Sequence, residues 1–323
     1  MSELTTTPSG ISAEHAELIS GLEAVFGALI DANYVQNTDV QVPPHGMPKD
    51  PIAVAPLRAA GLAPETIEVI GRLPCFTNDI LEEQKKLSSH VEGIPITPTS
   101  SATSYLLGGP GRYTESRDVG PDTNDKLPPT AFKLATATNS QGYNLAYDLN
   151  EKIILEWHPS KWSTCERYPV QTFFDEWARK LRTLEWLPWK NASGWQIEVR
   201  IDYDEKELAN PDSVIAKAIQ AKLEKQRQEW NAAGLEPEPI ENLYGGYLIS
   251  HKAAHNRYWA KYRIYEDCGW PGNFDKERFL QKQDEFNVKA HELGATVRAG
   301  EEETELGKEL LNFYRSAAGA HAV

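Results

Sequence analysis

The segment from Gln141 to Trp189 constrains the fold most, because two alternating apolar runs are followed directly by an aromatic helical pattern. Apolar residues occupy every second position in each run, a period that predicts strands. The polar stretch Asp148–Glu151 between the runs predicts a hairpin connection. Apolar residues then recur every three or four positions, which predicts an amphipathic helix. The patterned residues are Tyr143, Leu145, Tyr147, Ile153, Leu155 and Trp157 in the runs and Phe173, Phe174, Trp177, Leu181 and Leu184 in the helix.

Further patterns extend this sheet and surround it with helices. Ala131–Thr138 alternates well enough for another strand, and Tyr105–Leu107 is a buried strand fragment in a Pro- and Gly-rich stretch. Ser12 can cap a helix with an apolar stripe from Leu18 to Ile30, and Pro64 opens a short helix. The predicted fold class is therefore α+β, with a central antiparallel sheet, flanking helices and an α-helical C-terminal extension.

The chain is long enough for two units. We predict a disordered leader over 1–10, an α+β domain over 11–190 with KNASGW as the linker after Pro188, and a strand plus α-helical extension over 195–323. The strand over 195–203 can complete the first sheet or open the second unit. The helical patterns of the extension run over 212–230 and roughly 245–267, 275–293 and 301–318.

The net charge and the cysteine content indicate which partners and which cellular compartment to expect. Acidic residues outnumber basic ones by 47 to 33, and the net charge of -14 disfavours a nucleic acid partner. The first residues lack an apolar signal region, and no apolar run is long enough to cross a bilayer. Cys75, Cys165 and Cys268 are an odd number with no paired spacing. We expect a cytoplasmic or nuclear protein that is not secreted and has no membrane partner.

Several patterns could carry chemistry, and for each of them a structural role is favoured. His251 and His255 are four apart, a chelating spacing on a helix, but they lack the third ligand and the glutamate of a zinc peptidase. Cys165 with His158 can form a thiolate pair, yet a cysteine is often a small buried hydrophobe. The glycines over 106–113 favour a turn, and the carboxylates over 202–207 favour a charged surface. We expect no metal and no cofactor, and no catalytic residue is identified.

Aromatic residues gather in one short region of this acidic chain. Rings with a polar tip suit positions that are buried on one side and wet on the other, as in binding surfaces. The alternative is that the rings only cover the sheet of a loop-rich domain. The predicted binding residues are Trp157, Trp162, Tyr168, Trp186 and Trp189, with Trp195 in the same cluster.

Four stretches carry a resemblance to known proteins: GLAPETIEVIGRLPC, YNLAYDLNEKIILEW, FFDEWARKLRTLEWLP and YEDCGWPGNFDKERFLQKQDEF. They resemble a broad set of intracellular fungal proteins that carry no assigned activity. Over 131–187 the order strand, turn, strand, loop and aromatic helix is similar to the end of the SUKH superfamily of fungal cell-wall-assembly regulators and bacterial immunity proteins. This resemblance implies an α+β interaction protein without a catalytic centre, although the N-terminal half lacks the helix-then-sheet opening of that superfamily.

An enzyme remains the alternative. Fungal secondary metabolism contains enzymes with few recognisable motifs, among them arginine-containing cyclodipeptide synthases that use aminoacyl-tRNA. Their acidic motif resembles Asn78–Glu82 imperfectly, and the net charge opposes tRNA binding. We therefore favour a protein-binding or regulatory module that acts through its aromatic region, with a small molecule as the second ligand class.

Overall fold

The chain divides into two compact units, with the boundary after Glu198. The first unit carries the sheets, and the second, from Val199 onward, is helical. The computed structural model describes residues 13–42, 52–87, 93–106, 116–120, 125–138, 142–200, 210, 212–232, 240–294 and 305–319. The predicted leader and the Ser12 cap lie outside these ranges.

The first unit is built on a five-stranded antiparallel sheet, which confirms the predicted α+β class. The predicted hairpin is present, and Asn144 pairs with Trp157 at its open end. In its turn, the backbone amides of Asn150 and Glu151 donate to Asp148 Oδ1, which fixes the reversal of the chain. The strands, in their order across the sheet, are β3 (Ser100–Ala102), β4 (Ala131–Ala137), β5 (Asn144–Asp148), β6 (Ile153–Trp157) and β7 (Glu166–Pro169).

The predicted strand over Tyr105–Leu107 is wrong in its position. The strand that pairs with β4 is Ser100–Ala102, and Leu106 makes only an isolated bridge with Ile52. Tyr105 and Leu106 are nevertheless buried, and Tyr105 belongs to the main hydrophobic core. Leu107 lies outside the described residues.

The strand register places different side chains on the two faces of the sheet. Phe132 pairs with Tyr147, Tyr147 with Ile154, and Ile154 with Tyr168, so these side chains form one row on one face. The first three belong to the main hydrophobic core. The other face holds a smaller core of Val119, Leu127, Ala131, Ala146, Leu155 and Trp157.

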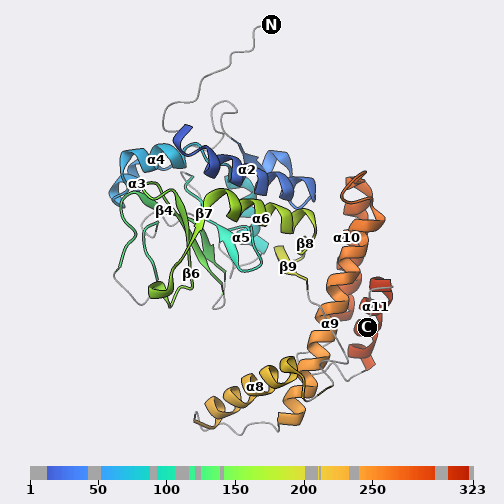
Figure 1. Ribbon diagram of the computed structural model, residues 1–323. Coiled ribbons are helices and arrows are strands. Elements are labelled where there is room, and N and C mark those ends of the chain that lie inside the picture. The colour runs from blue at the N-terminus through green and yellow to red at the C-terminus, as the bar shows by residue number, and fades with distance from the viewer. Residues whose placement is uncertain are drawn as a thin grey trace. The chain divides into compact units, whose positions relative to one another are not determined.

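Two helices lie side by side over the face with the main core (Figure 1). They are α2 (Ala16–Asp31) and the predicted aromatic helix α6 (Val170–Arg182). Gly21 of α2 meets Phe174 of α6, where a Cβ atom would lie 2.7 Å from the ring. The other elements before the sheet are β1 (Val40–Gln41), α3 (Val54–Ala59), α4 (Pro64–Ile70), β2 (Cys75–Phe76) and α5 (Asn78–Leu87).

The predicted linker is instead a hairpin of the first unit. Strands β8 (Trp186–Asn191) and β9 (Gly194–Val199) form a two-stranded sheet, and the turn between them lies within the KNASGW sequence. Gly194 has φ +100°, a conformation that glycine adopts readily. The sequence left open which unit contains the strand over 195–203. Trp195 is buried and lies in the first unit, so this strand begins there.

The second unit contains the predicted C-terminal helices. Aromatic rings gather at the turn between the second and third of these helices, where Tyr265 and Phe279 have centroids 4.4 Å apart. No helix in the described part of the chain combines the length and the apolar character that a membrane span requires. The helices are α8 (Val214–Ala232), α9 (Ile240–Asp267), α10 (Lys276–Gly294) and α11 (Glu305–Ala318).

Candidate functional site

Three of the aromatic residues that the sequence groups together lie in the interior. Trp157 is 1% exposed and Trp189 0% exposed, and Trp195 is also buried. The indole Nε1 of Trp157 donates to the Val119 carbonyl at 2.5 Å, and that of Trp195 donates to the Tyr34 carbonyl at 2.7 Å. The predicted binding roles of Trp157 and Trp189 are therefore corrected: both rings are enclosed by the fold and offer no surface to a partner.

Trp162 belongs to the opposite face of the sheet from α6. It begins a short 3-10 helix (Trp162–Thr164), is half-buried, and packs its ring edge-on against Trp157 at 4.9 Å between centroids. It adds to the small core there rather than to a surface shared with Tyr168 and Trp186. The single aromatic face expected from the sequence is thus divided by the sheet.

Tyr168 and Trp186 are joined by two rings of α6 into a continuous chain. The centroids of Tyr168 and Phe173 are 5.2 Å apart, those of Phe173 and Trp177 are 4.8 Å apart, and those of Trp177 and Trp186 are 5.6 Å apart. Trp177 is buried, whereas the other three are half-buried and pack against the main core. We call these four residues the aromatic strip.

Two glutamates lie beside the aromatic strip on the same face of the sheet. Glu156 of β6 pairs directly with Glu166 of β7 in the strand register. The Tyr168 hydroxyl donates to a carboxylate oxygen of Glu166, and this bond raises the pKa of Tyr168. Burial raises the pKa of Glu156, and the charge of Glu166 acts in the same direction. We call Glu156 and Glu166 the glutamate pair.

Lys180 of α6 connects the strip with the surrounding charges. Its Nζ lies 4.9 Å from the centroid of the Trp186 ring and 3.6 Å from a carboxylate oxygen of Glu176. Its charge also lowers the pKa of Glu156, against the effect of burial. Arg179, the residue before Lys180, donates a hydrogen bond to the same Glu176 and lowers the pKa of this carboxyl to about 2. The strip is therefore an apolar surface with a charged margin.

Sequence reasoning missed Phe173 as a half-exposed ring and missed the glutamate pair entirely. One signal was available: Glu156 follows Ile154 by two positions, so the strand period already places it on the face that Ile154 turns toward the helix. A carboxylate on the core-facing side of a strand is unusual, because charged residues are rarely buried, and it indicates a candidate functional residue. Its pairing with Glu166 depends on the register of β7, which the sequence pattern does not specify.

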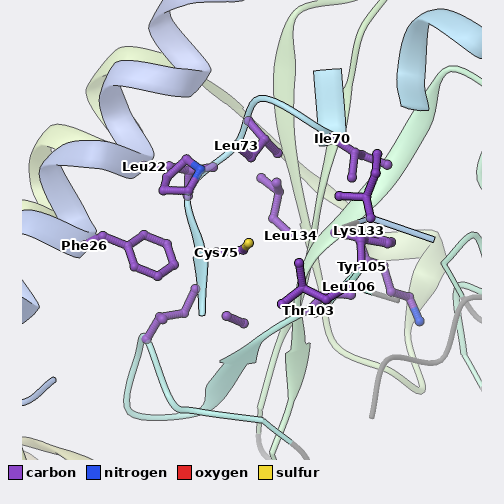
Figure 2. A pocket seen from close by; sticks show the side chains of 14 residues that line it. Leu22, Phe26, Ile70, Leu73, Cys75, Thr103, Tyr105, Leu106, Lys133 and Leu134 are labelled. Atoms are coloured by element: carbon purple, nitrogen blue, oxygen red, sulfur yellow. The ribbon is translucent and has the colours of Figure 1, made fainter. Parts of the chain in front are cut away.

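A separate apolar cavity of about 40 Å³ lies between α2 and the sheet. Figure 2 shows Leu22 and Phe26 of α2 on one side and Leu134 on the other, with the Cys75 side chain between them. Tyr105 also lines this space, but its hydroxyl donates to the Lys133 carbonyl at 2.5 Å and burial raises its pKa. The cavity suits a small apolar group better than acid–base chemistry.

The thiol candidates are not activated by their surroundings. Burial raises the pKa of Cys165 in spite of the nearby Arg167, and burial also raises the pKa of Cys268. Such thiols are protonated and weakly nucleophilic at neutral pH. The Nδ1 atom of His158 lies 2.9 Å from the Ser160 hydroxyl. The structure therefore gives the pair of Cys165 and His158 no support as a nucleophile and base.

The remaining sequence candidates are the histidines at 251 and 255, the glycines over 106–113, the carboxylates over 202–207 and the stretch Asn78–Glu82. His255 is buried with its ring beside Trp259, while the side chain of His251 and residues 107–113 and 201–207 lie outside the described set. Within the ranges that are described, no group of three or more His, Cys, Asp or Glu side chains is placed to hold a metal ion. The stretch Asn78–Glu82 opens α5, where Ile80 and Leu81 are core residues.

Comparisons with protein-family models, curated proteins and solved structures gave no match for this chain. The resemblance to the SUKH superfamily over 131–187 therefore stays a prediction, and the function has to be argued from the geometry of the site.

Proposed function

We propose that the first unit is a protein-binding module and that the aromatic strip is its contact surface. The observation that carries this proposal is the continuous chain of rings from Tyr168 to Trp186, of which three are half-buried. Tyr and Trp dominate the binding energy of protein interfaces because they bury a large area and still offer a polar group. A partly covered ring retains apolar area that a partner can bury.

The position of the strip beside β7 supports the same function. β7 is the last strand in the order of the five-stranded sheet, and three of its four residues are exposed. Glu166, Arg167 and Pro169 are residue types that discourage uncontrolled pairing at a sheet edge. A surface of rings beside a protected edge favours a specific side-chain contact over indiscriminate strand addition.

The test compares a double aromatic truncation with a single control truncation, both in the full chain. Tyr168→Ala combined with Trp186→Ala removes the two ends of the strip, and Trp162→Ala is the matched control on the opposite face of the sheet. Native mass spectrometry of protein purified from its own cells identifies a stoichiometric protein partner, and calorimetry with that purified partner measures affinity. We expect at least about a tenfold loss of affinity in the double variant and little change in the control.

Retention of full affinity by the double variant would show that the strip is not the contact surface. Urea unfolding of each variant, with its midpoint compared with that of the wild type, separates a lost contact from a lost fold. A stoichiometric small molecule in place of a protein partner would favour the second ligand class.

A further inference from the structure

The geometry points to a partner segment that places a lysine or arginine side chain against the glutamate pair while its apolar neighbour covers the aromatic strip. This inference rests on the proposed function, because it names the chemistry of the partner that the same surface accepts. It also goes beyond that function, since a purely apolar partner would satisfy the strip alone.

The first step is the direct opposition of two carboxylates across a strand pair. Glu156 and Glu166 are cross-strand partners, and like charges in this arrangement destabilise a sheet. Their neighbours in the register are apolar or aromatic: Leu145 pairs with Glu156 on the other side, and Tyr168 lies two positions along β7. Two opposed carboxylates lower the stability of the sheet, and locally destabilising residues of this kind occur mainly at functional positions.

The second step is the set of groups that face the glutamate pair. The Tyr168 hydroxyl donates to Glu166 and supplies a dipole without a positive charge. From α6, Lys180 acts on Glu156, but its ammonium group is also 3.6 Å from Glu176 and lies over the Trp186 ring. The contact of the same Tyr168 hydroxyl with Glu156 lowers the pKa of that carboxyl, again without adding a positive charge.

On β7 itself, the guanidinium group of Arg167 is engaged elsewhere. Arg167 alternates with Glu166 along the strand and forms an ion pair with Glu151. The positive charge that acts on Glu156 therefore comes from Lys180, which also contacts Glu176 and Trp186. An added cation would reduce the repulsion between them and the cost of keeping Glu156 charged.

The third step is charge complementarity on two scales. The whole chain carries a net charge of -14, which favours encounter with basic segments. At the site, carboxylates accept two parallel bonds from an arginine, and the neighbouring rings attract a cation through their faces. Lys180 over Trp186 already shows that a ring of the strip accepts a cation. A basic residue beside an apolar one fits both features at once.

The experiment uses the full-length protein labelled with nitrogen-15 and short capped peptides as probes. One peptide of glycine and serine carries a tryptophan and an arginine, and its twin carries citrulline in place of the arginine. Arginine methylamide is the third probe. The indole N–H signal of Trp186, assigned as the one that is missing from Trp186→Phe, reports binding at the strip. The protein variants are Glu156→Gln, Glu166→Gln and, as an equal change of charge on an exposed glutamate of α4, Glu65→Gln.

We expect the arginine peptide to shift the Trp186 signal and to bind about threefold more tightly than its citrulline twin, with weaker binding at higher salt. Glu166→Gln and Glu156→Gln should each remove this preference, whereas Glu65→Gln should retain it. Equal affinity for the two peptides, or a preference that survives in Glu166→Gln, would overturn the inference.

Failure of both peptides to bind the wild type would also overturn the inference. Arginine methylamide that binds as tightly as the peptide would overturn it too, because the ligand would then be a free cation rather than a protein segment. None of these outcomes decides the proposed function, which is tested with the partner from the cell and the Tyr168 and Trp186 variants.

Discussion

His15 is a buried titratable side chain that connects the start of α2 with the central sheet. It is 6% exposed, and its Nδ1 atom lies 2.7 Å from the Tyr147 hydroxyl. Burial lowers the pKa of His15 below its ordinary value of 6.5, the charge of Lys152 acts in the same direction, and Glu14 opposes them. Protonation therefore costs more in the folded chain than in the unfolded chain.

The sign of the resulting pH dependence follows from this lowered pKa. The unfolded chain takes up a proton on His15 near pH 6.5, while the folded chain takes it up only at lower pH. The free energy of unfolding should therefore be highest above pH 6.5 and fall as the pH drops through this value. Urea unfolding across this range, followed by tryptophan fluorescence, measures the slope. His15→Gln should flatten it, and a slope that is the same in His15→Gln and in the wild type would contradict the prediction.

At the scale of elements, the contact between α2 and α6 depends on a glycine. A Cβ atom on Gly21 would lie 2.7 Å from Cδ2 and 2.8 Å from Cβ of Phe174, and the Cβ atom of a side chain cannot swing away. Gly21→Ala should therefore lower the free energy of unfolding by about 1–3 kcal/mol, in spite of the better helix propensity of alanine. Urea unfolding measures the change.

Gly27, on the same helix, gives the matched comparison. A Cβ atom at Gly27 has no heavy atom within 4 Å, so Gly27→Ala should stabilise the fold by about 0.5–1 kcal/mol. Equal effects of the two substitutions would mean that the close approach of α2 to Phe174 does not limit the packing.

The elements that could be predicted from the sequence are those whose signal is local. The hairpin β5–β6 and helix α6 follow from apolar periods within a few residues, and the C-terminal helices follow in the same way. Strand β3 could not be found because Ser100–Ala102 has no apolar alternation, and its partner β4 begins almost 30 residues later. The β8–β9 hairpin was hidden because small polar residues suit a linker and a tight turn equally well.

The candidate site could likewise be predicted only as far as its signal is local in the sequence. An aromatic cluster was visible in the sequence, but the exposure of each ring depends on which segments cover each face of the sheet. Trp157 is enclosed because residues near Val119 and Leu127 pack over it, although these are distant in sequence. The glutamate pair depends likewise on the register of β6 with β7. Local periods predict elements, whereas a site requires the long-range pairing of those elements.

At the scale of the whole molecule, the position at which the first unit ends determines how long a fragment must be to fold without the second unit. The main core runs in sequence from Leu18 to Ile197, so a fragment of residues 1–198 contains all of it. A fragment of residues 1–190, which ends where the sequence alone places the domain boundary, lacks Trp195. In the intact unit the backbone amide of Trp195 donates to Gln84, and its indole donates to Tyr34.

The two fragments should therefore behave differently. We expect fragment 1–198 to unfold cooperatively in urea and to keep the near-ultraviolet circular dichroism of packed aromatic rings. Fragment 1–190 leaves the Tyr34 carbonyl and the Gln84 amide without these bonds and removes a buried tryptophan, a loss of at least about 3–5 kcal/mol. Because small domains are stable by only about 5–15 kcal/mol, the shorter fragment should be largely unfolded or should aggregate. Equal midpoints for the two fragments would show that the β8–β9 hairpin is not part of the folding unit, and the boundary would then move back to residue 190.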